Sequence, residues 1–413
     1  MEYSPVELVR PGNPPMLIQH GTLDKVAPIS QVRRFREVMM QAGNECMLIE
    51  YERGGHAFHY PGPARHFDRV IDATGEILPG RLAGNGHAIV IYDALSRAGV
   101  ERNLAWLKAR HGGRVSSIIG DIRDEDAVAR AASNAKAVFH MAAQVAVTTS
   151  LVDPREDFEI NVRGTINVLD AVRMRDEAVP VIFASTNKVY GDLGDFEFDT
   201  LHDRYEPKAF VTRRGVDESR PLDFHTPYGC SKGAADQYVL DYCRSFGIPT
   251  VVFRMSCIYG QRQMGTEDQG WVAHFLIRAL ERRPINVYGD GKQVRDVLDV
   301  GDAVNAYVAA LDNIEAVQGR VFNLGGGPAN AISLLELIDE IRSITGRDVE
   351  LEFEDWRRGD QRWYVSDTHL ARSALNLPQP LGWRNGVARL AKWLASEREL
   401  ELRPEMQLAG VAE

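Results

Sequence analysis

The sequence lacks the marks of several large classes of protein. Its 413 residues include only four cysteines, none of them in a C-x-x-C pair, so neither a disulfide framework nor a metal site is predicted, and reduced thiols in the cytoplasm are expected. No apolar run approaches the ~18 residues of a membrane-spanning helix, and the N-terminus has no signal-peptide pattern. The 58 acidic residues outnumber the 48 basic ones, which argues against nucleic acid or an anionic membrane as a partner.

A glycine-rich phosphate loop is also missing where one is expected. Residues 87–93, HAIVIYD, have the pattern of a buried parallel strand, and Asp93 at its tip is placed to accept hydrogen bonds from a ribose. A dinucleotide-binding unit has a G-x-x-G-x-x-G turn about twenty residues upstream, at the start of a helix. The glycines found there instead are Gly75, Gly80, Gly84 and Gly86, with Pro79 among them. Because their spacing fits no such turn, we predict that the first strand and its loop are absent and that 81–86 is the second half of the helix that normally follows.

The first eighty residues differ in pattern from the rest. Short apolar strands are predicted at 14–21 and 46–52, with an amphipathic helix at 30–43 between them and a second helix at 64–78 after them. Gly75 then lies inside a surface helix. The motifs HGTLDKVAP and GGHAF in this region resemble the C-terminal end of an α/β-hydrolase of the dienelactone-hydrolase or prolyl-peptidase kind.

The hydrolase resemblance implies Asp24 as the acid and His56 as the base of a Ser–His–Asp triad. In that family the nucleophilic serine lies on a G-x-S-x-G elbow before the acid. Only Ser4 precedes Asp24 here, and it lies in no such elbow. We therefore expect a hydrolase fragment without hydrolytic activity, joined to the rest of the chain near Gly80.

From Arg81 onward, apolar strands alternate with helical segments, which predicts a doubly wound parallel sheet of the Rossmann-like α/β class. Ligands bind such sheets at the carboxyl ends of the strands. Asp121 and Ile122 follow the strand VSSIIG, where an adenine ring would lie. Residues 142–144, Ala-Ala-Gln, follow the strand AVFHM, and their small side chains allow a flat ring to approach the backbone.

The segment TPYGCSKGAADQYVLDYC, from Thr226 to Cys243, carries the sharpest chemical signal. Pro227 favours a helix start, so Tyr228 and Lys232 lie at i and i+4 on one helical face. A Lys ammonium near a phenol favours the phenolate, which can remove a proton from a sugar hydroxyl beside a nicotinamide. Thr186 ends the strand PVIFAST and can hold the same substrate oxygen.

Together these residues resemble the extended short-chain dehydrogenase/reductase superfamily, and within it the nucleotide-sugar epimerases. The resemblance implies a Thr186–Tyr228–Lys232 triad. It also implies NAD as the cofactor, preferred over NADP because Asp93 would repel a 2′-phosphate. The residues implied in binding it are Asp93, Asp121, Ile122, Ala142, Ala143, Gln144, Tyr228 and Lys232.

The C-terminal third matches the same enzymes. VYGDGKQVRDVLDVGDAV places Arg295 where they hold the nucleotide's phosphate or ribose, and WRRGDQRWYVSD contains their R-x-G-D turn with Arg357 and Asp360. With Thr186 and Asn187, these are the substrate-binding residues that the resemblance implies. The alternative for each arginine is a solvated surface charge. Cys257, in FRMSCIYG, stands where many relatives have Asn, and we expect it to be a buried structural thiol.

The motifs STNKVYGD, HTPYGCSKGAADQYV, RMSCIYG and GTEDQGWVAHF are most similar to the CDP-paratose 2-epimerase (CDP-tyvelose epimerase) branch. Its implied reaction is transient oxidation of the sugar to a ketone, with hydride return to the opposite face at C2. The expected partners are a nucleotide sugar and a second copy of the chain in a homodimer.

The predicted domains are a hydrolase fragment at 1–80, an NAD-binding domain without its first strand at 81–255, a mainly nucleotide-sugar-binding domain at 256–395, and a tail at 396–413. Two alternatives to an epimerase stay open. A 4,6-dehydratase usually carries Asp-Glu directly after the strand-end Thr, whereas Asn187 and Lys188 stand there. The other alternative is a catalytically impaired fusion product, which the missing loop favours.

Overall fold

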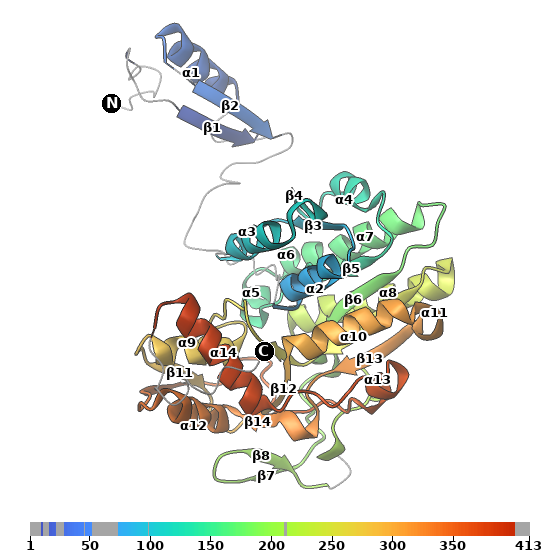
Figure 1. Ribbon diagram of the computed structural model, residues 1–413, viewed down its shortest axis with the longest axis vertical. Coiled ribbons are helices and arrows are strands. Elements are labelled where there is room, and N and C mark those ends of the chain that lie inside the picture. The colour runs from blue at the N-terminus through green and yellow to red at the C-terminus, as the bar shows by residue number, and fades with distance from the viewer. Residues whose placement is uncertain are drawn as a thin grey trace. The chain divides into compact units, whose positions relative to one another are not determined.

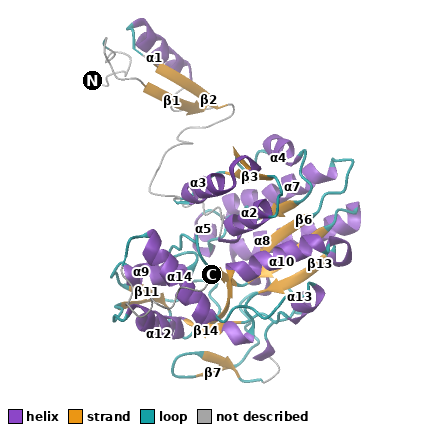
Figure 2. Ribbon diagram, viewed as in Figure 1, coloured by secondary structure: helices purple, strands orange, loops and turns teal. Residues whose placement is uncertain are grey.

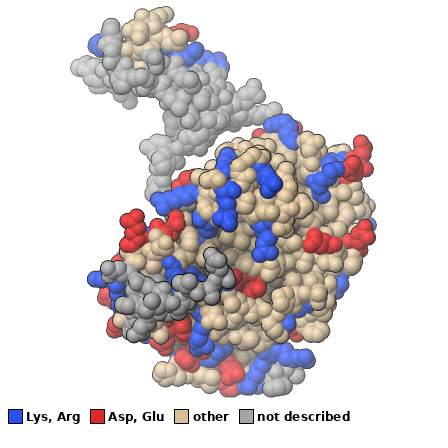
Figure 3. All heavy atoms as spheres, viewed as in Figure 1, with Lys and Arg blue, Asp and Glu red and all other residues tan. Residues whose placement is uncertain are grey.

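The computed structural model describes Arg10 and residues 16–21, 29–44, 46–51, 73–97, 99–209 and 213–400. Contacts divide the chain into two compact units, Met1–Arg65 and His66–Glu413, and Figure 1 shows their elements. On the face drawn in Figure 3, basic and acidic side chains of the second unit are interspersed. In the part of the chain that the structure describes, no helix combines the length and the apolar character needed to cross a membrane.

The first unit contains the predicted strand–helix–strand order. Strands β1 (Met16–Gly21) and β2 (Cys46–Tyr51) pair in parallel, and helix α1 (Ile29–Gln41) connects them. Met39 is buried on the apolar face of α1, and Gly43 follows the helix with a positive φ of 76°. Asp24 and His56, together with most of the helix expected at 64–78, lie outside the described residues.

Helix α2 (Ala73–Gly84) runs through the boundary that the sequence suggests at residue 80, with Pro79 inside it. Leu78 and Leu82 are buried in a core shared with helix α10 (Val300–Asp312). The contact division falls earlier, after Arg65. The sequence pattern placed the junction later because Pro79 and Gly80 suggest a break, whereas burial of the two leucines keeps the helix whole.

The predicted parallel sheet is interrupted. Strands β3 (Ile89–Asp93) and β4 (Val115–Ile119) form a separate two-stranded parallel sheet. A second sheet has the order β13-β9-β6-β5, with all three pairings parallel. Among the described residues, β3 pairs only with β4, and β5 pairs only with β6. The strands of the second sheet are β5 (Val138–His140), β6 (Val181–Thr186), β9 (Thr250–Met255) and β13 (Arg320–Leu324).

Helices cover both faces of the four-stranded sheet, as Figure 2 shows. Helices α7 (Gly164–Arg173) and α8 (Thr226–Phe246) pack on one face through a core that includes Val181 and Phe183. Helices α2 and α10 cover the other through a core that includes Ile182 and Ala184. Alternate residues of β6 therefore point to opposite faces, which explains its continuous apolar sequence. The remaining helices at this sheet and at β3–β4 are α3 (Val100–His111), α4 (Glu125–Ala132), α5 (Val147–Val152), α6 (Pro154–Phe158), α11 (Ile314–Val317) and α13 (His369–Ala374).

The C-terminal part builds a smaller layer of its own. Strand β12 (Val294–Asp299) pairs with β10 (Cys257–Tyr259), β14 (Ala331–Ser333) and β16 (Trp363–Tyr364). Two further pairs are β11 (Ile285–Tyr288) with β15 (Leu351–Glu354) and, earlier in the chain, β7 (Phe198–Thr200) with β8 (Tyr205–Pro207). Helices α9 (Trp271–Leu280), α12 (Leu334–Thr345) and α14 (Trp383–Glu397) enclose its core. Strand β13 also comes from this part of the chain and joins the four-stranded sheet.

Candidate active site

A cavity of about 210 Å³ lies where β6 ends and α8 begins. Five of the residues that the sequence singles out line it together: Ala143, Thr186, Asn187, Tyr228 and Lys232. They come from the end of β6, the start of α8 and the loop after β5. This is the carboxyl-end position at which doubly wound sheets bind their ligands.

Helix α8 brings Tyr228 and Lys232 to the cavity. It begins at Thr226 with Pro227 in its first turn, as the sequence predicted. Both side chains are buried. The Lys232 Nζ donates a hydrogen bond to the Ala184 carbonyl at 2.6 Å and lies 4.2 Å from the centre of the Phe183 ring. Burial lowers the pKa of Lys232 to about 7, against the effect of nearby carboxylates.

Thr186 is the last residue of β6, and its backbone leaves the strand at the cavity. Its hydroxyl accepts a hydrogen bond from the Lys188 backbone amide at 3.2 Å and donates one to the Asn187 Oδ1 at 3.4 Å. The Asn187 amide in turn donates to the Gln361 Oε1 at 3.2 Å. The strand end is thus fixed to the turn that contains Asp360.

Two cations, the buried Arg295 and the partly buried Lys188, contact the turn that contains Gly359 and Asp360. Arg295, on β12, is 7% exposed and forms an ion pair of 2.6 Å with Asp360. Lys188 donates from its Nζ to the Gly359 carbonyl at 3.0 Å, and burial lowers its pKa to about 8. Arg295 is therefore no solvated surface charge, and Lys188 joins the R-x-G-D turn to the end of β6.

Arg357 lies apart from Arg295. Its guanidinium stacks on Tyr288, 3.7 Å from the ring centre, and donates to the Glu267 carbonyl at 3.2 Å. It also pairs with the Asp268 carboxylate at 3.3 Å. Asp268 lines the cavity, so Arg357 supports the cavity wall through Asp268.

Sequence reasoning missed one wall of the cavity. The loop from Asp268 to Val272 lines it, as does Cys257, whose sulfur accepts a hydrogen bond from the Trp271 indole at 3.3 Å. Cys257, expected to be a buried structural thiol, is only partly buried and lines the cavity. The motif GTEDQGWVAHF pointed to this loop without indicating which of its residues would face a ligand.

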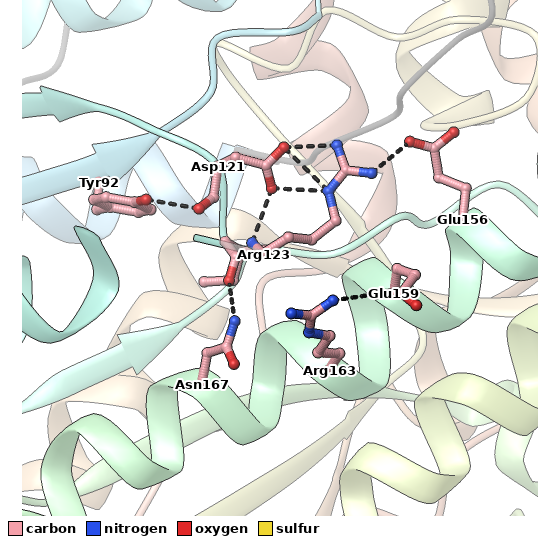
Figure 4. Close-up of polar contacts among 8 residues, drawn as sticks. Tyr92, Asp121, Arg123, Glu156, Glu159, Arg163 and Asn167 are labelled. Carbon is pink, nitrogen blue, oxygen red and sulfur yellow. Dashed lines mark hydrogen bonds and ion pairs between the residues drawn. The ribbon is translucent and has the colours of Figure 1, made fainter. Parts of the chain in front are cut away.

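The residues expected to hold adenosine lie at the ends of β3 and β4, which run parallel and side by side. The Asp93 carboxylate accepts a hydrogen bond from the Leu95 backbone at 2.6 Å. The Asp121 carboxylate forms an ion pair of 2.6 Å with Arg123, which also pairs with Glu156 at 3.0 Å, as Figure 4 shows. Both predicted acids therefore lie at one edge of the β3–β4 sheet, outside the lining of the cavity.

The side chains of Ile122 and Gln144 are buried in the protein interior. The Ile122 side chain is buried in a core with Val128, and its carbonyl accepts a hydrogen bond from Asn167 at 3.0 Å. Gln144 is 1% exposed, and its amide donates to the Asp157 carboxylate at 2.7 Å. Only their backbones remain for the cofactor roles that the sequence suggested. Ala142 is partly buried between these two segments.

One group of metal-ligand side chains occurs elsewhere in the described residues. Atoms of Asp192, Asp223 and His225 lie within 4.8 Å of one another. Asp192 and Asp223 are exposed, and His225 is partly so. Its Nε2 is 3.1 Å from the Asp223 carboxylate. The group precedes α8 and does not line the cavity.

Comparison with known proteins gives consistent results. The sequence model of the NAD dependent epimerase/dehydratase family matches residues 74–325. The CDP-paratose 2-epimerase of Salmonella typhi is 42% identical over 318 residues, which cover 75% of this chain and 93% of that protein. The match to the family begins at Thr74, inside α2.

Solved structures agree with the sequence relatives. The UDP-glucose 4-epimerase of Thermotoga maritima, solved with UDP-glucose, has a TM-score of 0.68 at 27% identity, covering 78% of this chain and 96% of that one. The UDP-glucuronic acid 4-epimerase of Bacillus cereus, in complex with UDP-glucuronic acid and NAD, has a TM-score of 0.67 at 25% identity with the same coverage.

Proposed function

Because the chain belongs to the NAD-dependent epimerase/dehydratase family, we propose that it is an epimerase of nucleotide sugars, acting at C2 of a substrate of the CDP-paratose/CDP-tyvelose type. The observation that carries this proposal is the meeting of Thr186, Tyr228 and Lys232 in one cavity. The 42% identity to a CDP-paratose 2-epimerase supports the choice of substrate.

The residues of the cavity suit proton transfer from a sugar hydroxyl. The charged form of Lys232 favours the phenolate of Tyr228, one helical turn away. That phenolate accepts the hydroxyl proton, and the Thr186 hydroxyl orients the same oxygen. NAD, when bound, supplies the acceptor and later the donor of the hydride at the same carbon. Tyr228 then returns the proton to the sugar oxygen, so the reaction has no net redox change.

The described residues fit the two ends of NAD better than its middle. Ala143 lines the cavity and leaves room for the nicotinamide, and Asp93 is at a strand end suited to the adenosine ribose. Asp121 holds the neighbouring loop through Arg123. No G-x-x-G-x-x-G turn precedes α2 in the sequence, since no glycine occurs between Gly62 and Gly75. The pyrophosphate therefore lacks the backbone cradle that such a turn provides.

A turnover experiment in heavy water tests this proposal. The chain, supplied with CDP-paratose and with enough NAD to overcome weak binding, is expected to form the C2 epimer. Proton NMR follows the appearance of the product. Because the hydrogen leaves and returns as hydride, the product should keep its original hydrogen at C2. Deuterium at C2 would indicate a deprotonation mechanism and contradict the proposal, and so would turnover that does not respond to added NAD.

We also propose that the protein forms a homodimer through α5, α6 and α8. Val152 on α5 is 83% exposed, Phe158 on α6 is 52% exposed, and Tyr238 on α8 is 44% exposed. Helices α5 and α6 both contact α8, and a second copy that covered these exposed apolar side chains would remove them from water. Val152→Asp is expected to give a monomer in sedimentation analysis. A dimer that persists in that variant would contradict this surface.

We further propose that residues 1–80 are a fragment of an α/β-hydrolase. The parallel β1–α1–β2 arrangement supports it. We infer that the fragment has no esterase activity, since no serine elbow precedes Asp24. A chromogenic ester should be hydrolysed no faster than by a His56→Ala variant, and a rate that depends on His56 would contradict this.

We place the enzyme in the cytoplasm. The cysteines in the second unit, Cys230, Cys243 and Cys257, are all free, and unpaired thiols are typical of reducing compartments. Fractionation of cells that express the chain would test the location.

A further inference from the structure

A chain of buried polar groups leads from Asp157 to the helix that carries the catalytic pair. Asp157 lies on α6 and is 1% exposed. Its Oδ1 accepts hydrogen bonds from the Gln144 amide at 2.7 Å and the Asn161 amide at 3.2 Å. The Asn161 amide also donates to the Ser231 hydroxyl at 2.9 Å. Ser231 directly precedes Lys232 on α8, so the carboxyl group is held against that helix.

The buried ammonium of Lys232 needs a negative charge near it. Its two contacts are the Ala184 carbonyl and the face of the Phe183 ring, and neither carries a full negative charge. A buried Lys without a counter-charge loses its proton, because burial disfavours the charged form. A neutral Lys232 would give no support to a phenolate at Tyr228.

Two carboxylates, Asp236 and Asp157, act on Lys232. Asp236 is already paired with Arg254, whose guanidinium lies 2.9 and 3.0 Å from its two oxygens. The donors to Asp157 in the described part of the chain are neutral: the amides of Gln144 and Asn161 and the hydroxyl of Ser231. Among the described residues, Lys232 is therefore the cation that balances the charge of Asp157.

The other titratable groups around this cluster do not replace Asp157. His140, on β5, faces Lys232, and burial lowers its pKa to about 3, so it is neutral at physiological pH. Tyr228 and the exposed Cys230 are the other titratable side chains on this part of α8. Asp236 and Arg254 form a neutral pair.

We propose that Asp157 is a positioning residue whose negative charge increases the protonated fraction of Lys232 and thereby favours the phenolate of Tyr228. The proposal rests on the roles of Tyr228 and Lys232 proposed above and adds a residue that does not line the cavity. It assigns a purpose to a carboxyl group that is otherwise costly to bury without a cationic partner in contact.

The electrostatics of the cluster give the direction of its pH response. Burial raises the pKa of Asp157 to about 6. Above that pH Asp157 is charged and supports the Lys232 ammonium. Below it the carboxyl group is neutral, and the pKa of Lys232 should fall further. Loss of the Asp157 charge should thus move the formation of the Tyr228 phenolate to higher pH.

The test measures the phenolate directly and needs neither turnover nor bound NAD. The full chain is titrated by ultraviolet difference absorbance against a Tyr228→Phe variant, so that the difference reports Tyr228. Asp157→Asn keeps the size of the side chain and removes its charge. It is expected to raise the midpoint for Tyr228 by about one pH unit. Asp126→Asn, which removes an exposed carboxylate on α4, should leave the midpoint unchanged.

An unchanged midpoint in a folded Asp157→Asn variant would overturn the proposal, and so would a Tyr228 midpoint in the parent chain at the ordinary value of about 10. If Asp157→Asn does not fold, Gln144→Leu serves in its place. It removes the shorter hydrogen bond to the carboxylate and should move the midpoint in the same direction by less, and no movement would contradict the proposal. If the midpoint for Tyr228 shifts but the chain does not epimerise CDP-paratose, the proposed function is contradicted and the proposed role of Asp157 is not.

Discussion

The two parts of the parallel sheet differ in how completely they are buried. In β6 all six residues are buried, and in β9 only Met255 is partly exposed. In the β3–β4 pair, by contrast, Val90 is 53% exposed and Ile119 is 57% exposed. Both parts are equally apolar in sequence. Burial in a parallel sheet depends on neighbours on both sides, which β6 has in β5 and β9 and which β3 does not have among the described residues.

This difference separates the residues proposed for proton transfer from those proposed to bind the cofactor. Thr186, Tyr228 and Lys232 all depend on the four-stranded sheet and α8, which are complete. Asp93 and Asp121 depend on β3 and β4, which are isolated from that sheet in the described part of the chain. We therefore predict a proton-transfer site that is intact and a cofactor site that is weakened, and each prediction below tests one side of that contrast.

The largest effect is expected from restoring the missing strand and loop. We predict that the chain as it stands binds NAD weakly. Replacing residues 1–72 with an apolar strand and a G-x-x-G-x-x-G turn, while keeping α2, should strengthen binding about 10²–10⁶-fold. The reason is that two or three hydrogen bonds to a charged pyrophosphate contribute about 1.5–3 kcal/mol each. Calorimetric titration with NAD measures the difference.

The control for this design is the same replacement with each loop glycine changed to Ala, which keeps the strand and blocks close approach of the pyrophosphate. That variant should lose most of the gain. Micromolar or tighter binding of NAD by the unmodified chain would show that the interrupted sheet does not weaken the cofactor site.

The second effect is loss of turnover on removal of the Tyr228 hydroxyl. In a version that binds NAD, Tyr228→Phe should lower the rate of epimerisation about 10²–10⁴-fold, because a positioned acid/base contributes that much. Binding of the nucleotide sugar should change little. Steady-state rates with CDP-paratose test this, and Tyr238→Phe, on the exposed side of α8, is the matched control. Turnover at the parental rate would remove Tyr228 from the mechanism.

The sequence predicts features that depend on local patterns better than it predicts contacts between distant residues. The apolar strands, the start of α8 at Thr226 and the absence of a glycine loop are local patterns, and each was evident from a few adjacent residues. The Gln144–Asp157 hydrogen bond and the wall formed by Cys257 and Trp271 join residues that are distant in sequence or lack a motif. The continuity of α2 through Pro79 was also missed, because burial of Leu78 outweighs the local tendency of Pro to end a helix.

A third effect is the difference in stability between the two parts of the sheet. Phe253, on β9, is 0% exposed and packs against Tyr307 with ring centres 4.8 Å apart. Phe253→Ala should therefore cost about 3–5 kcal/mol of unfolding free energy. Ile119→Ala, at an exposed position on β4, should change it by less than about 0.5 kcal/mol. Urea unfolding of both variants gives the comparison, and equal losses would mean that β4 is buried in solution.

The smallest effect concerns pH and tests the complete part of the sheet alone. His140, on β5, is 3% exposed and its Nε2 lies 2.9 Å from the Thr165 hydroxyl. Burial lowers its pKa from 6.5 to about 3 in the folded state, so between these values the unfolded chain binds the additional proton. Stability from this residue is therefore present above pH 6.5 and is lost as the pH falls. It should decrease by about 1 kcal/mol between pH 7.5 and 5.5.

Asp157 contributes with the opposite sign, since its pKa is raised on folding, so the informative quantity is the difference between parent and variant. His140→Gln can keep a hydrogen bond to Thr165 and should reduce the loss on acidification by about that amount in urea unfolding at the two pH values. His87→Gln, at an exposed position before β3, should leave the loss unchanged, and an equal effect of the two variants would show that β5 is as open to water as the β3–β4 pair.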